Sequence, residues 1–511
     1  MIHGDPLQPR QEWAAGVEPV ERRKSSVDRL LRDVVGQRPV CRHRVGPVPH
    51  ERPDASEQLV DGVFIAFAGQ LDEKRVLHLY VGTARAAPFF PWRHRHDCGR
   101  GRIPVGDTRW MRAPKILAFA SAVDLDFGYG GTPAWWQLWK GLYQIGVDLI
   151  VTPYRGRAVE SPWWRTARNP LYREAELYAA ARSFAARLRG DRYLRRPEHD
   201  PGDTDRLVRE VIWRFATPRL ERHLERVLAS EGDVDAVMVF GVPMSHIRGV
   251  ANKLREKYAV PVIYYDGDVP MSLPEFGGMD TGFNFYYGAD PTEYDLVLCN
   301  SEGGANRLRE LGARRVETIF WGVDPDFFFP LDVEKEVDVF FYGYGDKFRR
   351  DWMRALVGEP SRRLDGVDFA LGGGDFRGDI GCARLIGDVP FNVFARAISA
   401  ARINLNMTRR PHATVFASST CRPFELAACG AAIVSNPYSG IERWFEPGRE
   451  LVVVSDAQEA ENAYRELLAD PAAAKAMGDR ARERAMDEHT YAHRARRLLE
   501  LIGVRRREAV A

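Results

Sequence analysis

Residues 414–454 read TVFASSTCRPFELAACGAAIVSNPYSGIERWFEPGRELVVV, and this stretch decides the fold of the chain. Its pattern predicts a polar loop, a helix over 423–429, a buried strand over 431–435 and a short strand over 451–454. Gly430 ends the predicted helix, at a position that favours the left-handed backbone region. The stretch therefore indicates part of an α/β domain.

A cation and a carboxylate, Arg422 and Glu425, lie at the start of this helix. Backbone N–H groups are free in the first turn of a helix, and with a cation beside them they suit the phosphates of a ligand. A carboxylate one turn further on suits a vicinal diol. We therefore predict a nucleotide-sugar site here. The alternative is a local i,i+3 ion pair that only caps the helix.

The composition excludes several classes of protein. With 511 residues, 45% of them hydrophobic and 28% charged, the chain has the composition of a soluble protein of about three domains. The net charge of +2 argues against a dedicated nucleic-acid binder. The six cysteines have no paired spacing, and no apolar run is long enough for a transmembrane segment. We expect a cytoplasmic protein.

Residues 1–112 differ from the rest because they are rich in arginine and show little periodicity. We expect a poorly ordered or irregular extension, in which 63–67 and 76–81 are candidate strands of a hairpin. No metal is predicted. The group His94, His96 and Cys98 lacks a second ligand pair at structural-zinc spacing.

From Lys115 onward strands and helices alternate, which is typical of a Rossmann-like domain. A glycine turn with Gly130 and Gly131 precedes a helix predicted over 134–145. These glycines let a ligand approach the backbone, or they simply make a tight turn.

Polar residues follow two buried strands of this first half. Asp266 and Asp268 come after the strand at 261–265, and His246 comes soon after the strand at 236–240. Strand ends face the ligand crevice in doubly wound sheets, so these three residues are our candidates for acceptor binding or base catalysis.

The second half restarts with a strand over 337–341. Glycines after it let the backbone approach a diphosphate, and the following cations can neutralise that diphosphate. Two amides near the end of the strand at 403–407 are candidates to bind the donor sugar or phosphate, or else to satisfy loop backbone. The predicted donor-binding residues of these two regions are Gly343, Tyr344, Gly345, Lys347, Arg350, Asn404 and Asn406.

The order RPFE, AACG, AIVS, SGIE and FEPGRE, followed by a helical region over 457–502, resembles the C-terminal domain of GT-B glycosyltransferases. It is most similar to the group named after the spore maturation protein CgeB, which is related to family-4-type enzymes. The segment GVDPDFFFP at 322–330 resembles the linker of those enzymes.

This resemblance implies two Rossmann-like domains facing a cleft: an acceptor domain over 113–325 and a donor domain over 326–485. A terminal helix within 486–511 would pack back on the first domain. The loops that would line the acceptor side of the cleft contain Gly130, Gly131, Ser301 and Glu302.

One position departs from the family-4 pattern, in which two glutamates stand eight residues apart. Glu425 matches the second, ribose-binding glutamate, but Ala417 occupies the first position. Arg422 matches the arginine that the CgeB-like group carries before its F-E pair. Ser418, Ser419 and Thr420 are expected to supply hydrogen bonds in place of the missing glutamate.

We expect transfer of a hexose-like group from a nucleoside diphosphate sugar to an unknown acceptor, without a metal or other cofactor. The sequence leaves both stereochemical outcomes at the anomeric carbon open: the family resemblance implies retention, whereas inversion requires a base. Two alternatives remain. One is another GT-B chemistry such as an epimerase, and the other is a non-catalytic nucleotide-sugar-binding or scaffold protein, suggested by Ala417.

Overall fold

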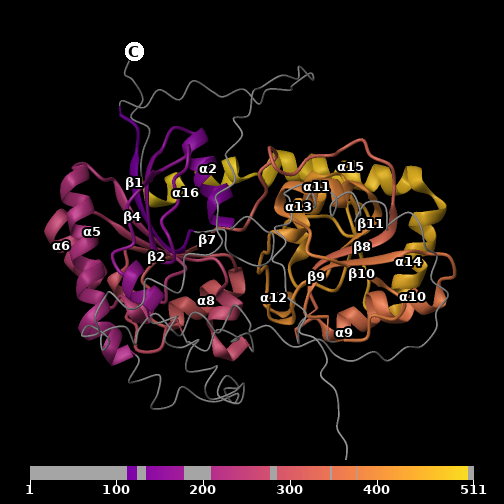
Figure 1. Ribbon diagram of the computed structural model, residues 1–511, viewed down its shortest axis with the longest axis horizontal. Helices are drawn as coiled ribbons and strands as arrows, with labels where there is room; N and C mark the ends of the chain where they lie inside the picture. The colour runs from indigo at the N-terminus through magenta and orange to yellow at the C-terminus, as the bar shows by residue number, and fades with distance from the viewer. Residues whose placement is uncertain are drawn as a thin grey trace, which may run out of the picture. The chain divides into compact units, whose positions relative to one another are not determined.

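The computed structural model describes residues 112–123, 134–177, 209–276, 285–345, 348–376 and 378–503. These residues form two parallel sheets with helices packed against both faces of each (Figure 1). The candidate hairpin within 63–81, the group at 94–98 and the predicted site residues Gly130, Gly131 and Lys347 lie outside the described residues.

The first sheet has the strand order β3-β2-β1-β4-β5-β6-β7. Its central strands are buried on both faces because their sequences are nearly continuous apolar runs. The strands are β1 (Lys115–Ala122), β2 (Asp148–Arg155), β3 (Arg165–Thr166), β4 (Ala236–Phe240), β5 (Val262–Asp266), β6 (Leu296–Cys299) and β7 (Val316–Thr318). The helices are α2 (Ala134–Gln144), α5 (Thr217–Glu231), α6 (Val250–Tyr258), α7 (Val269–Ser272) and α8 (Glu302–Glu310).

The second sheet has the order β10-β9-β8-β11-β12-β13. Its strands are β8 (Val337–Tyr344), β9 (Phe369–Gly374), β10 (Arg384–Gly387), β11 (Ala401–Asn406), β12 (Ala432–Ser435) and β13 (Val452–Val453). The order of connection reverses between β8 and β11, and ligands of doubly wound sheets bind outside the carboxyl ends of the strands at such a point.

Helices cover this second sheet on both faces, with α11 and α13 on one side and α10 and α14 on the other. They are α9 (Arg350–Met353), α10 (Glu359–Arg363), α11 (Phe391–Ser399), α12 (Arg410–Thr414), α13 (Arg422–Ala428), α14 (Ala457–Ala469), α15 (Pro471–Glu488) and α16 (Tyr491–Ile502). Gly430 ends α13 with a φ of 67°, as the sequence predicts. The region 457–502 divides into three helices because Asp470 and Thr490 cap new N-termini.

The last helix lies against the first domain. Figure 1 shows α16, in yellow, beside α2, in indigo. The contact is close at Gly141, where a Cβ atom would lie 2.8 Å from the carbonyl oxygen of Tyr491. The backbone of the linker joins this contact, since the Tyr491 N–H donates to the Val323 carbonyl. Gly141 is therefore required by packing.

We expect the substitution Gly141→Ala to lower the free energy of unfolding by about 1–3 kcal/mol, because the added methyl group meets a backbone that cannot move aside. Helix propensity alone predicts the opposite, a gain of about 1 kcal/mol. Calorimetric melting of the full chain measures the difference, with Tyr143→Phe, at an exposed position of the same helix, as the control. A raised melting temperature for Gly141→Ala would contradict the close packing of α2 and α16.

Candidate functional site

The start of α13 brings together the two residues that the sequence singles out. Arg422 Nη1 lies 3.0 Å from Glu425 Oε2, and the guanidinium packs over the ring of Phe394 at 4.5 Å. Glu425 is 9% exposed, and burial raises its pKa while Arg422 opposes that shift. The contact between Nη1 and Glu425 is an ion pair without hydrogen-bond geometry, so the buried Nη1 atom has no hydrogen-bond partner within the described part of the chain. The local ion pair thus exists, but it leaves a buried donor unused.

The carboxyl ends of β8 and β11 are tied together by Arg349. Its guanidinium donates to the carbonyl oxygens of Met407 and Tyr344 at 2.7 and 2.9 Å.

Two predicted donor-binding residues lie close by in the sequence. Arg350 begins α9 and is exposed. Gly345 packs closely, since a Cβ atom there would lie 2.5 Å from the ring of Phe376. This glycine is therefore explained by packing, whatever it also does for a ligand.

The two predicted amides of β11 lie inside the sheet. Asn404 Nδ2 donates to the Ile398 carbonyl at 3.1 Å, and Asn406 Nδ2 donates to Ser435 Oγ at 2.9 Å. Both residues are fully buried. Each amide nitrogen therefore has a structural partner, although neither partner is a loop backbone group, and a donor-binding role for them stays a prediction.

Two of the three candidate bases are enclosed. Asp266 is 1% exposed and accepts hydrogen bonds from Tyr286 Oη at 2.6 Å and Ser272 Oγ at 3.1 Å. Burial raises its pKa to about 6. His246 is fully buried against Tyr154 Oη at 3.0 Å, and burial lowers its pKa to about 3. Neither side chain is open to a substrate in this arrangement.

The third candidate, Asp268, lies in a cluster that reaches into the second domain. Its side chain is 48% exposed, and its Oδ1 atom lies 2.6 Å from His412 Nε2 and 3.1 Å from Arg409 Nη2. His412 Nδ1 lies 2.8 Å from Ser418 Oγ. Sequence reasoning missed Arg409 and His412. Their position just beyond the end of β11, where polar residues face a ligand crevice, was the available signal.

The loop at 416–420 is docked on the first domain. Ser301 caps α8 by accepting from the Gly304 N–H and donates its hydroxyl to the Phe416 carbonyl. Ser419 Oγ accepts from the Trp321 N–H at 2.9 Å and donates to the Asn300 carbonyl.

The other predicted residues of this loop and of the acceptor side are more open. Glu302 forms an ion pair with Arg443 at 3.0 Å. Thr420 is half-buried beside the start of α13. The predicted residues Ser301, Glu302 and Ser419 therefore lie where the two domains touch, and whether they contact an acceptor or donor stays a prediction.

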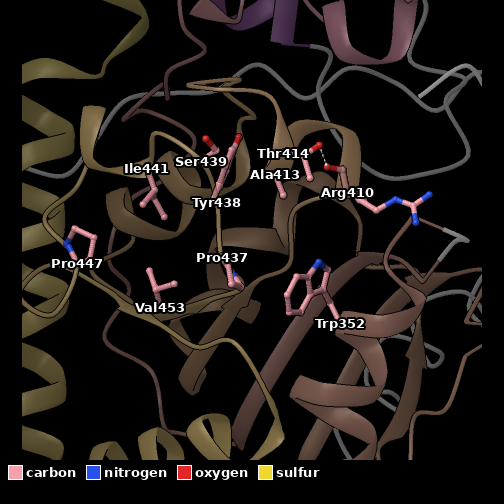
Figure 2. Close-up of a pocket in the computed structure, with 10 residues that line it drawn as sticks. All are labelled: Trp352, Arg410, Ala413, Thr414, Pro437, Tyr438, Ser439, Ile441, Pro447 and Val453. Atoms are coloured by element: carbon pink, nitrogen blue, oxygen red, sulfur yellow. Dashed lines mark hydrogen bonds between the residues drawn. The ribbon is translucent and has the colours of Figure 1, made fainter. Parts of the chain in front are cut away.

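A cavity of about 560 Å³ hollows the carboxyl edge of the second sheet (Figure 2). Its lining is mostly apolar, and the Arg410 side chain points away from it. The lining residues are Trp352, Arg410, Ala413, Thr414, Pro437, Tyr438, Ser439, Ile441, Pro447 and Val453. The helix α12 thus contributes to two features, this cavity and the cluster that contains His412.

Two features are absent from the described residues. They contain no group of three or more histidine, cysteine, aspartate or glutamate side chains arranged to hold a metal ion. None of the helices in this part of the chain is long and apolar enough to cross a membrane.

Comparisons with known proteins agree with this fold. A family model described as "Glycosyl transferase-like" matches residues 349–500. The fold is similar to sucrose-phosphate synthase from Thermosynechococcus elongatus, with a TM-score of 0.51 and 16% identity over 76% of this chain and 98% of that one. It is also similar to trehalose-6-phosphate synthase (OtsA), with a TM-score of 0.51 and 12% identity over the same shares. A search of curated proteins found no match.

These findings establish the fold of the protein. It has the predicted GT-B fold of two Rossmann-like domains, and its second half matches the glycosyl transferase-like family model.

Proposed function

We propose that this protein is a glycosyltransferase that moves a hexose-like group from a nucleoside diphosphate sugar to an acceptor, without a metal or other cofactor. One observation carries the proposal: a buried carboxylate, Glu425, is paired with the half-buried Arg422 at the carboxyl edge of the second sheet, inside the region that matches the family model. The buried Arg422 Nη1 has donor capacity that the ion pair does not use.

The chemistry requires stabilisation of the charge that develops on the leaving diphosphate. Preorganised cations perform this task well because they need no reorganisation during the reaction. Arg422 is such a cation, held between Glu425 and the Phe394 ring, and Arg350 is a second cation on α9. The carboxylate of Glu425 would accept hydrogen bonds from the ribose hydroxyl groups.

The geometry supports retention rather than inversion at the anomeric carbon. An inverting enzyme needs a base that reaches the acceptor and has a pKa near the working pH. Asp266 and His246 are enclosed. Asp268 is accessible, but Arg409 and His412 hold the pKa of its carboxyl well below its usual range, although burial opposes them. A carboxylate with so low a pKa is a weak base.

The same proposal includes membership of the CgeB-like group and a cytoplasmic location. Arg422, before Phe424 and Glu425, supports membership of the CgeB-like group. The cysteines have no paired spacing of the kind that disulfide-bonded proteins show, which supports the cytoplasmic location.

The test uses the full chain with UDP, GDP and dTDP and with UDP-glucose, GDP-mannose and dTDP-glucose, each with and without EDTA. One nucleotide class should stabilise the protein by about 2.7 kcal/mol at a hundredfold excess over its dissociation constant, independently of EDTA. The matching sugar nucleotide should release nucleoside diphosphate in the presence of an acceptor. Failure of all six compounds to bind would overturn the proposal.

A non-catalytic nucleotide-sugar-binding protein is the second candidate, and Ala417 favours it. Ala417 is fully buried with a φ of 45°, and its Cβ atom would lie 3.0 Å from a Cβ atom added at Gly440. The position that carries a glutamate in family-4-type enzymes is thus closely packed here. Binding of a sugar nucleotide without turnover on any acceptor would favour this candidate.

A further inference from the structure

We propose that His412 and Arg409 are positioning residues that hold Asp268 ionised and oriented, so that its exposed side receives a hydroxyl group of a sugar substrate. The inference rests on the proposed function and adds three residues to it. Asp268 follows β5 of the first domain, whereas Arg409 and His412 follow β11 of the second. The carboxylate is therefore oriented by the domain opposite to its own.

The hydrogen bonds fix the tautomer of His412. Its Nε2 atom lies 3.1 Å from Arg409 Nη2 and 2.6 Å from Asp268 Oδ1, and at the shorter distance an ionised carboxylate requires a donor. Nε2 thus carries the proton, and Nδ1 accepts from the Ser418 hydroxyl at 2.8 Å. The Tyr438 hydroxyl donates to the Ser418 carbonyl and fixes that residue in turn. The imidazole is held at both nitrogen atoms.

The charges favour this arrangement. His412 is 1% exposed, and burial lowers its pKa while Asp268 opposes that shift, so the imidazole is neutral near pH 7. Arg409 then supplies the positive charge that balances Asp268. Among the described residues, Asp266, on the strand before Asp268, and Arg349, beside His412, also act on the charges of the cluster.

The exposed side of Asp268 determines what it can bind. Its two oxygen atoms lie 3.1 and 3.2 Å from the same Arg409 nitrogen, while 48% of the side chain remains exposed. An ionised carboxylate accepts hydrogen bonds and donates none, so a hydroxyl group is the suitable neutral partner. The hydroxyl belongs either to the donor sugar or to the acceptor sugar.

The experiment compares His412→Leu with His412→Gln in the full chain. Glutamine keeps an N–H donor toward Asp268, whereas leucine removes it. With the sugar nucleotide that the protein accepts among UDP-glucose, GDP-mannose and dTDP-glucose, we expect His412→Leu to raise the KM about tenfold, the effect of one hydrogen bond. His412→Gln should stay close to the wild type, and both should bind the nucleoside diphosphate alone with unchanged affinity.

The arms distinguish the source of the hydroxyl. If His412→Leu raises the KM for hydrolysis of the sugar nucleotide by water, the hydroxyl group that Asp268 binds belongs to the donor sugar. Unchanged hydrolysis, with weaker stimulation of diphosphate release by added glucose, fructose or sucrose, assigns it to the acceptor. No change in either, or equal losses in both variants, would overturn the proposal.

A measurement without nucleotide separates this inference from the proposed function. In the ¹⁵N spectrum of histidine-labelled protein, the signal that disappears in His412→Gln should show a proton on Nε2 of a neutral ring at pH 7 and a pKa below the ordinary histidine value. Titration near the ordinary histidine pKa of about 6.5 would overturn the positioning role even if nucleotides bind. If no nucleotide binds, the proposed function fails and the sugar-hydroxyl role fails with it.

Discussion

The substitution Lys140→Met should lower the free energy of unfolding by about 3–5 kcal/mol, the usual effect of removing one partner of a buried ion pair. The Lys140 ammonium lies 2.6 Å from Asp324 Oδ2 and 2.8 Å from Asp326 Oδ2. Lys140 and Asp324 are buried, whereas Asp326 is exposed. Methionine fills a similar volume, but it leaves the Asp324 carboxylate buried without its positive partner.

A matched control is available on the surface. Lys253 forms an ion pair of 2.8 Å with Glu221, and its side chain is 58% exposed, so Lys253→Met should cost no more than about 1 kcal/mol. Calorimetric melting of the two variants gives the comparison. Equal losses would show that the Lys140 pair contributes no more than a surface pair. The double variant Lys140→Met, Asp324→Asn should recover part of the loss.

The loss of stability in Lys140→Met should depend on pH. Burial raises the pKa of Asp324 and Lys140 opposes that shift, so removing Lys140 raises the folded-state pKa further. A carboxyl group whose folded pKa lies above its unfolded value binds more protons when folded, and stability then decreases as pH rises between the two values. The deficit of Lys140→Met should therefore be largest near neutral pH and shrink on acidification toward the unfolded pKa of about 3.9.

Local signals predicted much of the fold. The end of α13 at Gly430 could be predicted because a glycine suited to a left-handed C-cap is followed directly by an apolar run of strand length. Asp268 could be predicted as a site candidate because it follows β5, and the carboxyl ends of parallel strands lie at one edge of the sheet. The GT-B architecture followed from the resemblance of the second half, and the structural comparisons confirm it.

Long-range contacts account for what the sequence did not show. His412 and Asp268 are 144 residues apart, and Lys140 and Asp324 are 184 residues apart. No helix or strand periodicity in the sequence can therefore predict either contact. The enclosure of Asp266 depends on the Tyr286 hydroxyl, which comes from a different segment. Composition and spacing identify a strand-end carboxylate, but its exposure and its pKa are set by residues that only the folded chain brings near it.

The substitution Arg422→Met tests whether the pair on α13 serves a ligand or only the helix. Loss of a charge-assisted hydrogen bond to a diphosphate costs about 1.5–3 kcal/mol, which corresponds to roughly a 10–150-fold weaker affinity for the nucleoside diphosphate that binds among UDP, GDP and dTDP. Titration calorimetry on the full chain measures this. Arg449→Met is the control, because Arg449 and Glu446 form an exposed i,i+3 pair of 3.1 Å.

Stability and affinity separate the two interpretations in the double variant Arg422→Met, Glu425→Gln. Arg422→Met alone leaves the Glu425 carboxylate buried without its cation, so it should also destabilise the protein. The double variant is neutral at both positions and should regain much of that stability. If the pair only caps α13, nucleotide affinity should be that of the wild type in both variants. If Arg422 binds the diphosphate and Glu425 the ribose, affinity should stay low in the double variant although the fold is restored.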